Sequence, residues 1–101
     1  MKGIFNIFAN SVDTSNKMLT TQNVRADIIG ELEAIIQYEL HLEQTNDQSA
    51  KNAISDIVDE EKVHVGQLFG LLFKLDPISK EMFYKGLNEF NKDDSVQSWI
   101  K

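Results

Sequence analysis

The chain has 101 residues, of which 42% are hydrophobic, and carries a formal net charge of −6 at pH 7. This length accommodates one small domain, and the acidic balance argues against a nucleic-acid surface, which needs a basic patch. The absence of cysteine excludes disulfides, thiolate zinc sites, iron–sulfur clusters and redox thiols. Any bound metal must therefore use oxygen and imidazole ligands, which suit iron, manganese or zinc.

The distribution of apolar residues argues against a membrane protein. No apolar run approaches the roughly 18 residues of a membrane span. The opening MKGIFNIFANSVD is too short and too broken to resemble a signal peptide. We expect a cytoplasmic protein without nucleic-acid or membrane partners.

We expect residues 1–101 to form a single all-α domain. Residues 1–15 begin with an amphipathic segment, in which Met1, Ile4, Phe5, Phe8 and Val12 have helical spacing. Such a segment must dock on its own domain or on a partner.

Residues 16–76 are predicted to form an antiparallel helical hairpin. Helical periodicity runs from about 16 to 43 and again from 48 to 75. Between them, the residues Gln44-Thr45-Asn46-Asp47 have turn chemistry. Asp76-Pro77 stops the second helix, because the residue before proline is pushed out of the helical region.

A shorter third helix is expected over residues 79–90. Ser79 has the chemistry of its N-cap, and Ile78 and Phe83 are spaced as a hydrophobic staple. Phe83, Leu87 and Phe90 would dock this helix. Residues 91–101 form a polar tail.

Polar residues interrupt the apolar stripes of the two long helices. The stripe at positions 24, 28, 31, 35, 38 and 42 is apolar or aromatic except at Glu31. The stripe at positions 50, 54, 57, 61, 64, 68, 71 and 75 is apolar except at Glu61 and His64. A carboxylate in an apolar seam costs several kcal/mol unless it is paired or bound to metal.

Counting residues places the three polar side chains at one height. If the turn is centred near residue 46, antiparallel positions whose numbers sum to about 92 lie side by side, and Glu31 and Glu61 meet this condition. Both would lie roughly 22 Å from the turn at a rise of 1.5 Å per residue. His64 follows one turn later on the same face as Glu61. These residues therefore predict a metal site.

The site predicted from one chain is only half of a known arrangement. Di-iron carboxylate bundles use one Glu from each of two helices and a Glu-x-x-His from each of two others. This chain has one copy of each part. A twofold dimer of hairpins would supply the second copy and form a ferritin-like four-helix bundle, so the site makes a homodimer obligatory.

Residues 21–77 resemble the encapsulated ferritins, the two-helix relatives of ferritin and rubrerythrin. The resemblance lies in Glu31-Leu32-Glu33-Ala34-Ile35 with Tyr38, in Asp59-Glu60-Glu61-Lys62-Val63-His64, and in Leu-Asp-Pro at 75–77. It implies ferroxidase ligands at Glu31, Glu61 and His64, shared between two subunits, and larger rings that are commonly decamers. It also implies oxidation of Fe(II) by O2, with storage inside an encapsulin shell. Tyr38 matches a tyrosine that flanks the metal centre, and Glu33 a carboxylate of a secondary metal-entry site.

The chain departs from the family pattern at two places. Gly30 stands where the family usually has another acid before the ligand Glu, which weakens the match to the entry site. The tail Ser95-Val96-Gln97-Ser98-Trp99-Ile100-Lys101 is similar in outline to the family's shell-targeting peptide but lacks its glycine.

The sequence thus favours a di-iron ferroxidase that serves iron storage or detoxification. Two alternatives stay open: a rubrerythrin-like di-iron peroxidase, and a zinc-binding or purely structural helical adaptor. His41, near the turn, is predicted to be exposed. Apolar residues beside the main stripes need cover from the third helix, the N-terminal segment or further oligomer contacts; they are Ile29, Leu32, Ile36, Val65, Phe69 and Leu72.

Overall fold

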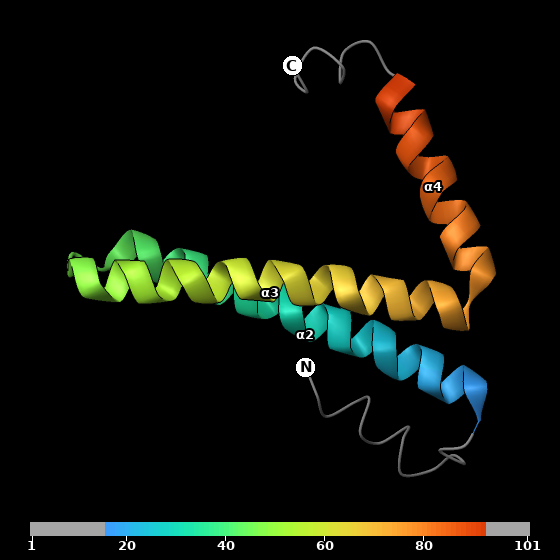
Figure 1. Ribbon diagram of the computed structural model, residues 1–101, viewed down its shortest axis with the longest axis horizontal. Coiled ribbons are helices and arrows are strands. Elements are labelled where there is room, and N and C mark those ends of the chain that lie inside the picture. The colour runs from blue at the N-terminus through green and yellow to red at the C-terminus, as the bar shows by residue number, and fades with distance from the viewer. Residues whose placement is uncertain (1–15, 93–101) are drawn as a thin grey trace.

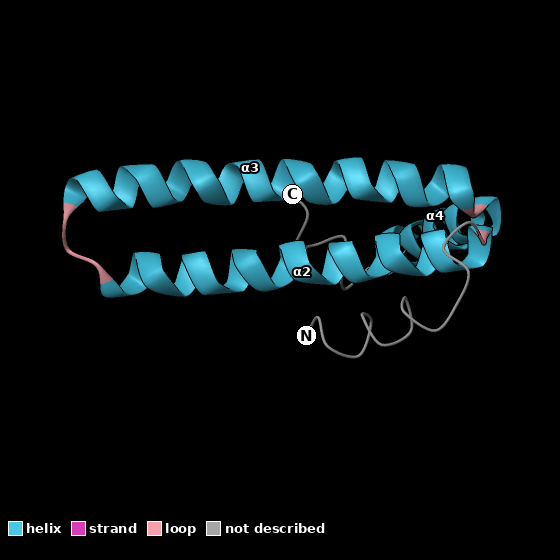
Figure 2. Cartoon of the chain, turned by 90° about the horizontal axis from the view of Figure 1, so that it is seen from below, coloured by secondary structure: helices cyan, strands magenta, loops and turns pink. Residues whose placement is uncertain are grey.

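The computed structural model describes residues 16–92, which form three helices and no strand. The helices are α2 (Lys17–Gln44), α3 (Gln48–Leu75) and α4 (Pro77–Lys92). Figure 1 shows α2 and α3 side by side, with α4 leaving the end of α3, and Figure 2 shows the short loop that joins the first two helices. The all-α hairpin with a third helix is confirmed. The second helix has the predicted bounds, and the first is displaced by one residue.

Short-range hydrogen bonds define the ends of α2. The side chain of Asn16 accepts a hydrogen bond from the Met18 backbone N–H at 2.7 Å, which satisfies one of the free amides of the first turn. At the other end, the Thr45 N–H donates to the His41 carbonyl at 3.1 Å. Only three residues then separate α2 from α3, and so short a connection forces the helices to run antiparallel as neighbours.

The hairpin is held together mainly at its open end. Val24 and Ile28 of α2 form a buried cluster with Leu72 of α3, and Leu68, Phe69, Phe73 and Leu75 pack against it. Nearer the turn, Ile54 and Val58 are also buried. The predicted α2 stripe is confirmed, because every member from 24 to 42 is buried or partly buried.

The predicted α3 stripe is wrong along one row of the helix, where positions 57, 64 and 71 are exposed. Val58 and Leu72 are only 3% and 5% exposed, whereas Ile57 and Leu71, which were expected in the seam, are 37% and 44% exposed. Apolar residues occupy two adjacent rows of α3, at 57 and 71 and at 58 and 72. Spacing alone cannot tell which row faces α2, and the second row is the one that does.

The third helix begins two residues earlier and ends two residues later than predicted, at Pro77 and Lys92. Asp76, not Ser79, has the capping position: its Oδ1 accepts a hydrogen bond from the Ser79 N–H at 3.3 Å. Pro77 then occupies the first helical position, where its missing N–H and fixed φ are favourable. The predicted staple is also wrong, because Ile78 is exposed.

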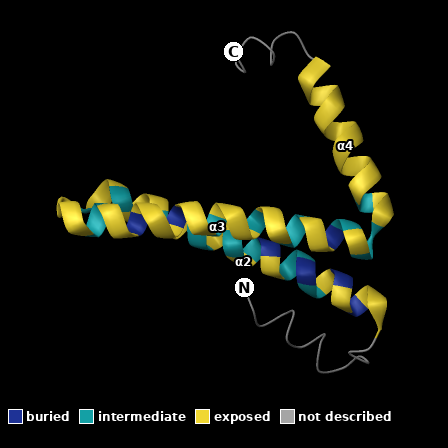
Figure 3. Ribbon diagram, viewed as in Figure 1, coloured by how far each residue is buried: buried dark blue, intermediate teal, exposed yellow. Residues whose placement is uncertain are grey.

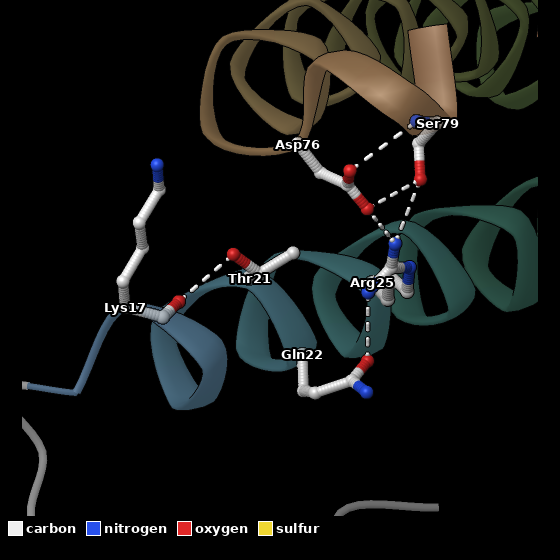
Figure 4. Close-up of polar contacts among 6 residues, drawn as sticks. All are labelled: Lys17, Thr21, Gln22, Arg25, Asp76 and Ser79. Atoms are coloured by element: carbon white, nitrogen blue, oxygen red, sulfur yellow. Dashed lines mark hydrogen bonds and ion pairs between the residues drawn. The ribbon is translucent and has the colours of Figure 1, made fainter. Parts of the chain in front are cut away.

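An ionic latch joins α2 to the start of α4 (Figure 4). Arg25 Nη2 donates to Asp76 Oδ2 at 2.8 Å and to Ser79 Oγ at 2.9 Å, and Ser79 Oγ donates to Asp76 Oδ2 at 2.6 Å. The Ser79 hydroxyl and N–H, followed by the Arg25 guanidinium, hold the pKa of Asp76 below its ordinary value. We call Arg25, Asp76 and Ser79 the elbow latch.

Aromatic contacts complete the elbow, but most of α4 remains uncovered. Phe83 packs on Phe69 and Phe73 of α3, with ring centroids 5.4 and 5.2 Å apart. Leu87 and Phe90 are exposed, and Figure 3 shows exposure along nearly all of α4. The prediction that all three of these α4 residues dock on the chain therefore holds only for Phe83.

Among residues 16–92, no helix is long and apolar enough to cross a membrane. The predictions for the N-terminal segment 1–15 and for the tail from residue 93 onward lie outside the described residues. Residues 91 and 92, which were assigned to the tail, belong to α4.

Candidate metal centre

Glu31, Glu61 and His64 come together in the middle of the hairpin. His64 Nδ1 lies 3.6 Å from Glu31 Oε2 and 3.7 Å from Glu61 Oε2. One ligand atom from each residue lies within 4.8 Å of the other two. The predicted convergence of these side chains is thus present within a single chain.

The register of the hairpin accounts for this convergence. The loop at residues 45–47 sets Glu31 level with Glu61, and His64 follows one turn along α3. Apolar contacts lie on both sides of the cluster, from Val24, Ile28 and Leu72 toward the open end and from Ile54 and Val58 toward the turn. The cluster therefore sits in a seam whose two ends hold the helices together.

The three side chains differ in exposure. The Glu61 and Glu31 side chains are 19% and 27% exposed, and the His64 side chain is 46% exposed. His64 therefore lies at the edge of the seam, in the same row of α3 as the exposed Ile57 and Leu71, since residues seven apart lie almost above one another. We call this side of the hairpin the metal-centre face.

The distances between the three side chains are those expected of ligands around one ion, and they are too long for hydrogen bonds between the side chains. Both His64–carboxylate distances exceed hydrogen-bond length. Ligand atoms at about 2.0–2.2 Å from one metal ion lie roughly 3 Å apart. The three side chains therefore need to approach one another only slightly to bind one ion. Two carboxylates and an imidazole form an oxygen and nitrogen set that suits iron, manganese and zinc.

Two basic residues of the hairpin form ion pairs away from the cluster. Lys62, adjacent to Glu61, lies 3.5 Å from Glu39, and Arg25 belongs to the elbow latch. Because the two carboxylates are crowded together in the seam, a divalent cation would relieve their repulsion.

The other residues singled out in the sequence lie outside this cluster. Glu33 is exposed and lies about 200° around α2 from Glu31 at 100° per residue. Tyr38 is partly buried two turns further along α2, and His41 is exposed as predicted. Gly30 has open space around its Cα. Within residues 16–92, the group of acidic and histidine side chains that could hold an ion is Glu31, Glu61 and His64.

Comparison with known proteins finds relatives of this chain in sequence and in fold. No family model matches the chain. It is 32% identical over 77 residues to a ferritin-like–encapsulin shell fusion protein of Pyrococcus furiosus, covering 76% of this chain and 22% of that protein. It is 34% identical over 64 residues to the encapsulin nanocompartment cargo protein EncC of Myxococcus xanthus, covering 60% of this chain and 49% of that protein.

The crystal structure of the encapsulated ferritin domain from Pyrococcus furiosus superposes with a TM-score of 0.78 at 29% identity, covering 84% of this chain and 87% of that one. The chain belongs to the encapsulated ferritins. The resemblance in sequence is thereby confirmed in the fold. The chain spans about a fifth of the length of the Pyrococcus furiosus fusion protein and about half of the length of EncC.

Sequence reasoning missed the elbow latch. Arg25 lies in the predicted first helix and attracted no attention, because its partners lie 51 and 54 residues away. A basic residue on α2 opposite the Asp-Pro that ends α3 was the available signal. The spacing of the apolar residues also did not show which of the two rows of α3 faces α2 and which lies on the metal-centre face.

Proposed function

We propose that two copies of this encapsulated ferritin pair their metal-centre faces and complete a di-iron ferroxidase centre. Each copy contributes Glu31, Glu61 and His64. The observation that carries the proposal is the convergence of these two carboxylates and one imidazole on one point in the seam, within 4.8 Å of one another.

The chemistry requires the second copy. Six ligands hold the two irons of di-iron carboxylate bundles, and one chain brings three. Beside His64, the side chains of Ile57 and Leu71 expose apolar surface in the same row. A twofold axis that runs through the cluster would cover this row with its counterpart and bring the second three ligands opposite the first.

Each residue has a role that follows from its position. Glu31 and Glu61, the more buried pair, would hold the cations and compensate their charge. His64, at the edge of the seam, would offer one neutral nitrogen ligand. Bound iron would supply the redox chemistry, in which two Fe(II) are oxidised to Fe(III) and one O2, with two protons, is reduced to hydrogen peroxide.

The proposed setting follows from the relatives. One is named as a fusion to an encapsulin shell and another as an encapsulin cargo. We infer that this chain is also encapsulin cargo, in a cytoplasmic compartment where iron oxidised at the centre is stored. Co-expression with an encapsulin shell protein tests this: the full chain should co-purify with shell particles, and a chain that stays outside them contradicts the cargo role.

The ferroxidase is tested by iron binding and oxidation. Anaerobic Fe(II) titration should saturate near one iron per chain, and O2 should then oxidise it rapidly. Glu31→Gln should abolish rapid oxidation, whereas the matched control Glu33→Gln, on the far side of the same helix, should retain it. Full oxidation by a stable monomer would contradict the shared centre.

Three further measurements separate the alternatives. Faster turnover with H2O2 than with O2, given an electron donor, would indicate a peroxidase. Tight Zn(II) binding without iron oxidation, or equal melting temperatures with and without metal, would indicate an adaptor.

A further inference from the structure

The apolar row of α4 is covered only at its beginning. Phe83, Leu87 and Phe90 are spaced i, i+4 and i+7 and share one side of the helix, which we call the α4 row. Phe83 packs on Phe69 and Phe73 of α3, whereas Leu87 and Phe90 are 43% and 51% exposed. In Figure 1, α4 diverges from the hairpin, so the later turns of the row move away from α3. The described part of the chain therefore leaves most of this row uncovered.

The direction of α4 is fixed by the elbow. Arg25 of α2 donates hydrogen bonds to Asp76 and Ser79 at the start of α4. One turn later, the Tyr84 ring lies against Phe73 of α3, with ring centroids 6.1 Å apart. A surface that is held in place beforehand loses little conformational entropy when another segment docks on it. The α4 row is thus well suited to receive a helix.

Residues 1–12 carry an apolar row that needs a partner. At 100° per residue, its five members cover an arc of about 100° on a helix, which is the width of a stripe that faces a core; they are Met1, Ile4, Phe5, Phe8 and Val12. Lys2, Asn6 and Asn10 fall on the other side. Lys2 is also the one charged side chain among residues 1–12, so docking of the apolar row buries no charge.

The two apolar rows match in spacing when their helices are antiparallel. From position 12 to 8 to 5 the steps are four and three residues, and from 83 to 87 to 90 they are also four and three. Each row therefore covers roughly 10 Å of helix. An antiparallel pair brings position 12 opposite 83, position 8 opposite 87 and position 5 opposite 90.

The attachment point of residues 1–12 lies near the α4 row. Residues 13–15 connect them to Asn16, the N-cap of α2, and three residues span roughly 10 Å when extended. Figure 1 shows that α2 and α4 begin at the same end of the hairpin. A segment that turns back at residues 13–15 can therefore run beside α4 in the antiparallel direction. Such a short tether gives an effective concentration in the millimolar range, which favours the chain's own segment over another molecule.

We propose that residues 1–12 form a helix that packs on the α4 row of the same chain. Phe8 lies against Leu87 and Phe5 against Phe90, and the fold gains a fourth helix at its open end. The contact involves neither iron nor the metal-centre face. It therefore stands or falls independently of the proposed ferroxidase, and all of its tests use metal-free protein.

Disulfide trapping tests the contact directly, because the chain has no cysteine of its own. A full-length chain with Phe8→Cys and Leu87→Cys should form an intrachain disulfide on oxidation and migrate faster on a non-reducing denaturing gel. In the matched control, Lys85→Cys replaces Leu87→Cys; Lys85 lies about 200° around α4 from Leu87 and should give little product. No cross-link, or equal cross-linking through position 85, would overturn the proposal.

A mixture of single-cysteine chains shows which molecule supplies the helix. When Phe8→Cys chains are oxidised together with Leu87→Cys chains, little disulfide between positions 8 and 87 is expected, because the two positions meet within one chain. A yield equal to that of the intrachain product would overturn the proposal, since the α4 row would then be covered by another copy.

Hydrogen exchange of the full chain provides a test without cysteine. The backbone amides of residues 4–12 should be protected in wild type, and Leu87→Gln with Phe90→Gln should reduce this protection by about tenfold or more. Lys85→Gln, on the other side of α4, should leave it unchanged, and unaltered exchange in α2 and α3 shows that the double variant is folded. Unprotected amides in wild type, or protection that survives the double substitution, contradict the proposed contact.

Discussion

Replacing Glu31 by glutamine should stabilise the metal-free protein. Ligand atoms of Glu31 and Glu61 lie within 4.8 Å of each other. At that distance two like charges repel by about 0.9 kcal/mol in water and about 3.5 kcal/mol at an effective dielectric constant of 20. Both side chains retain partial exposure, 27% and 19%, so the lower part of this range applies, about 1 kcal/mol. For a chain of this size, that corresponds to a rise in melting temperature of about 4 °C or more.

The assay is thermal unfolding of metal-free protein at pH 8, followed by circular dichroism at one chain concentration. Equal concentration matters because self-association stabilises by mass action. Glu33→Gln removes the same charge from the exposed side of α2 and should change the melting temperature much less. With anaerobic Fe(II), the order should reverse, because wild type gains about 2.7 kcal/mol at a hundredfold excess over the dissociation constant and Glu31→Gln does not. A metal-free Glu31→Gln protein that melts at or below wild type would refute the account of mutual repulsion.

Further predictions concern the seam, the latch and the third ligand. Leu72→Ala should cost about 2–5 kcal/mol in urea denaturation, whereas Leu71→Ala in dilute protein should cost under about 1 kcal/mol; equal losses would contradict the seam observed here. Asp76→Asn should lower the urea midpoint relative to wild type by an amount that is constant from pH 8 to 5. Because the folded pKa is depressed, the difference should shrink only below the ordinary aspartate pKa of about 3.9, and a difference that vanishes already at pH 6 would rule out the carboxylate as its source. His64→Gln should weaken Fe(II) binding by tenfold or more while His41→Gln leaves it unchanged, and equal effects would contradict the role of His64.

The hairpin was predictable because its determinants are local. Periodicity defined both long helices, and the turn at Gln44–Asp47 fixed the register that sets Glu31 level with Glu61. Whether the 57/71 row or the 58/72 row of α3 faces α2 was not predictable, because both rows are apolar and either could pack against α2. The start of α4 was missed because Ser79 has good capping chemistry, yet Asp76 caps one turn earlier and lets Pro77 begin the helix.

The candidate site was predictable to the level of residues, because charged side chains in an apolar stripe conflict with their surroundings and require an explanation. Its three members converge as counted. Their metal and their reaction are a different matter, since an oxygen and nitrogen ligand set suits several metals. The elbow latch was missed because Asp76 and Ser79 lie 51 and 54 residues from Arg25 and meet it only once the hairpin has formed.

The most direct test of the central claim is the position of iron in crystals of the anaerobically Fe(II)-loaded protein, measured by anomalous diffraction at the iron absorption edge. The account predicts two iron peaks between paired hairpins, within bonding distance of Glu31, Glu61 and His64 from both copies. Iron bound elsewhere, or held by the three residues of one chain without a partner, would contradict it.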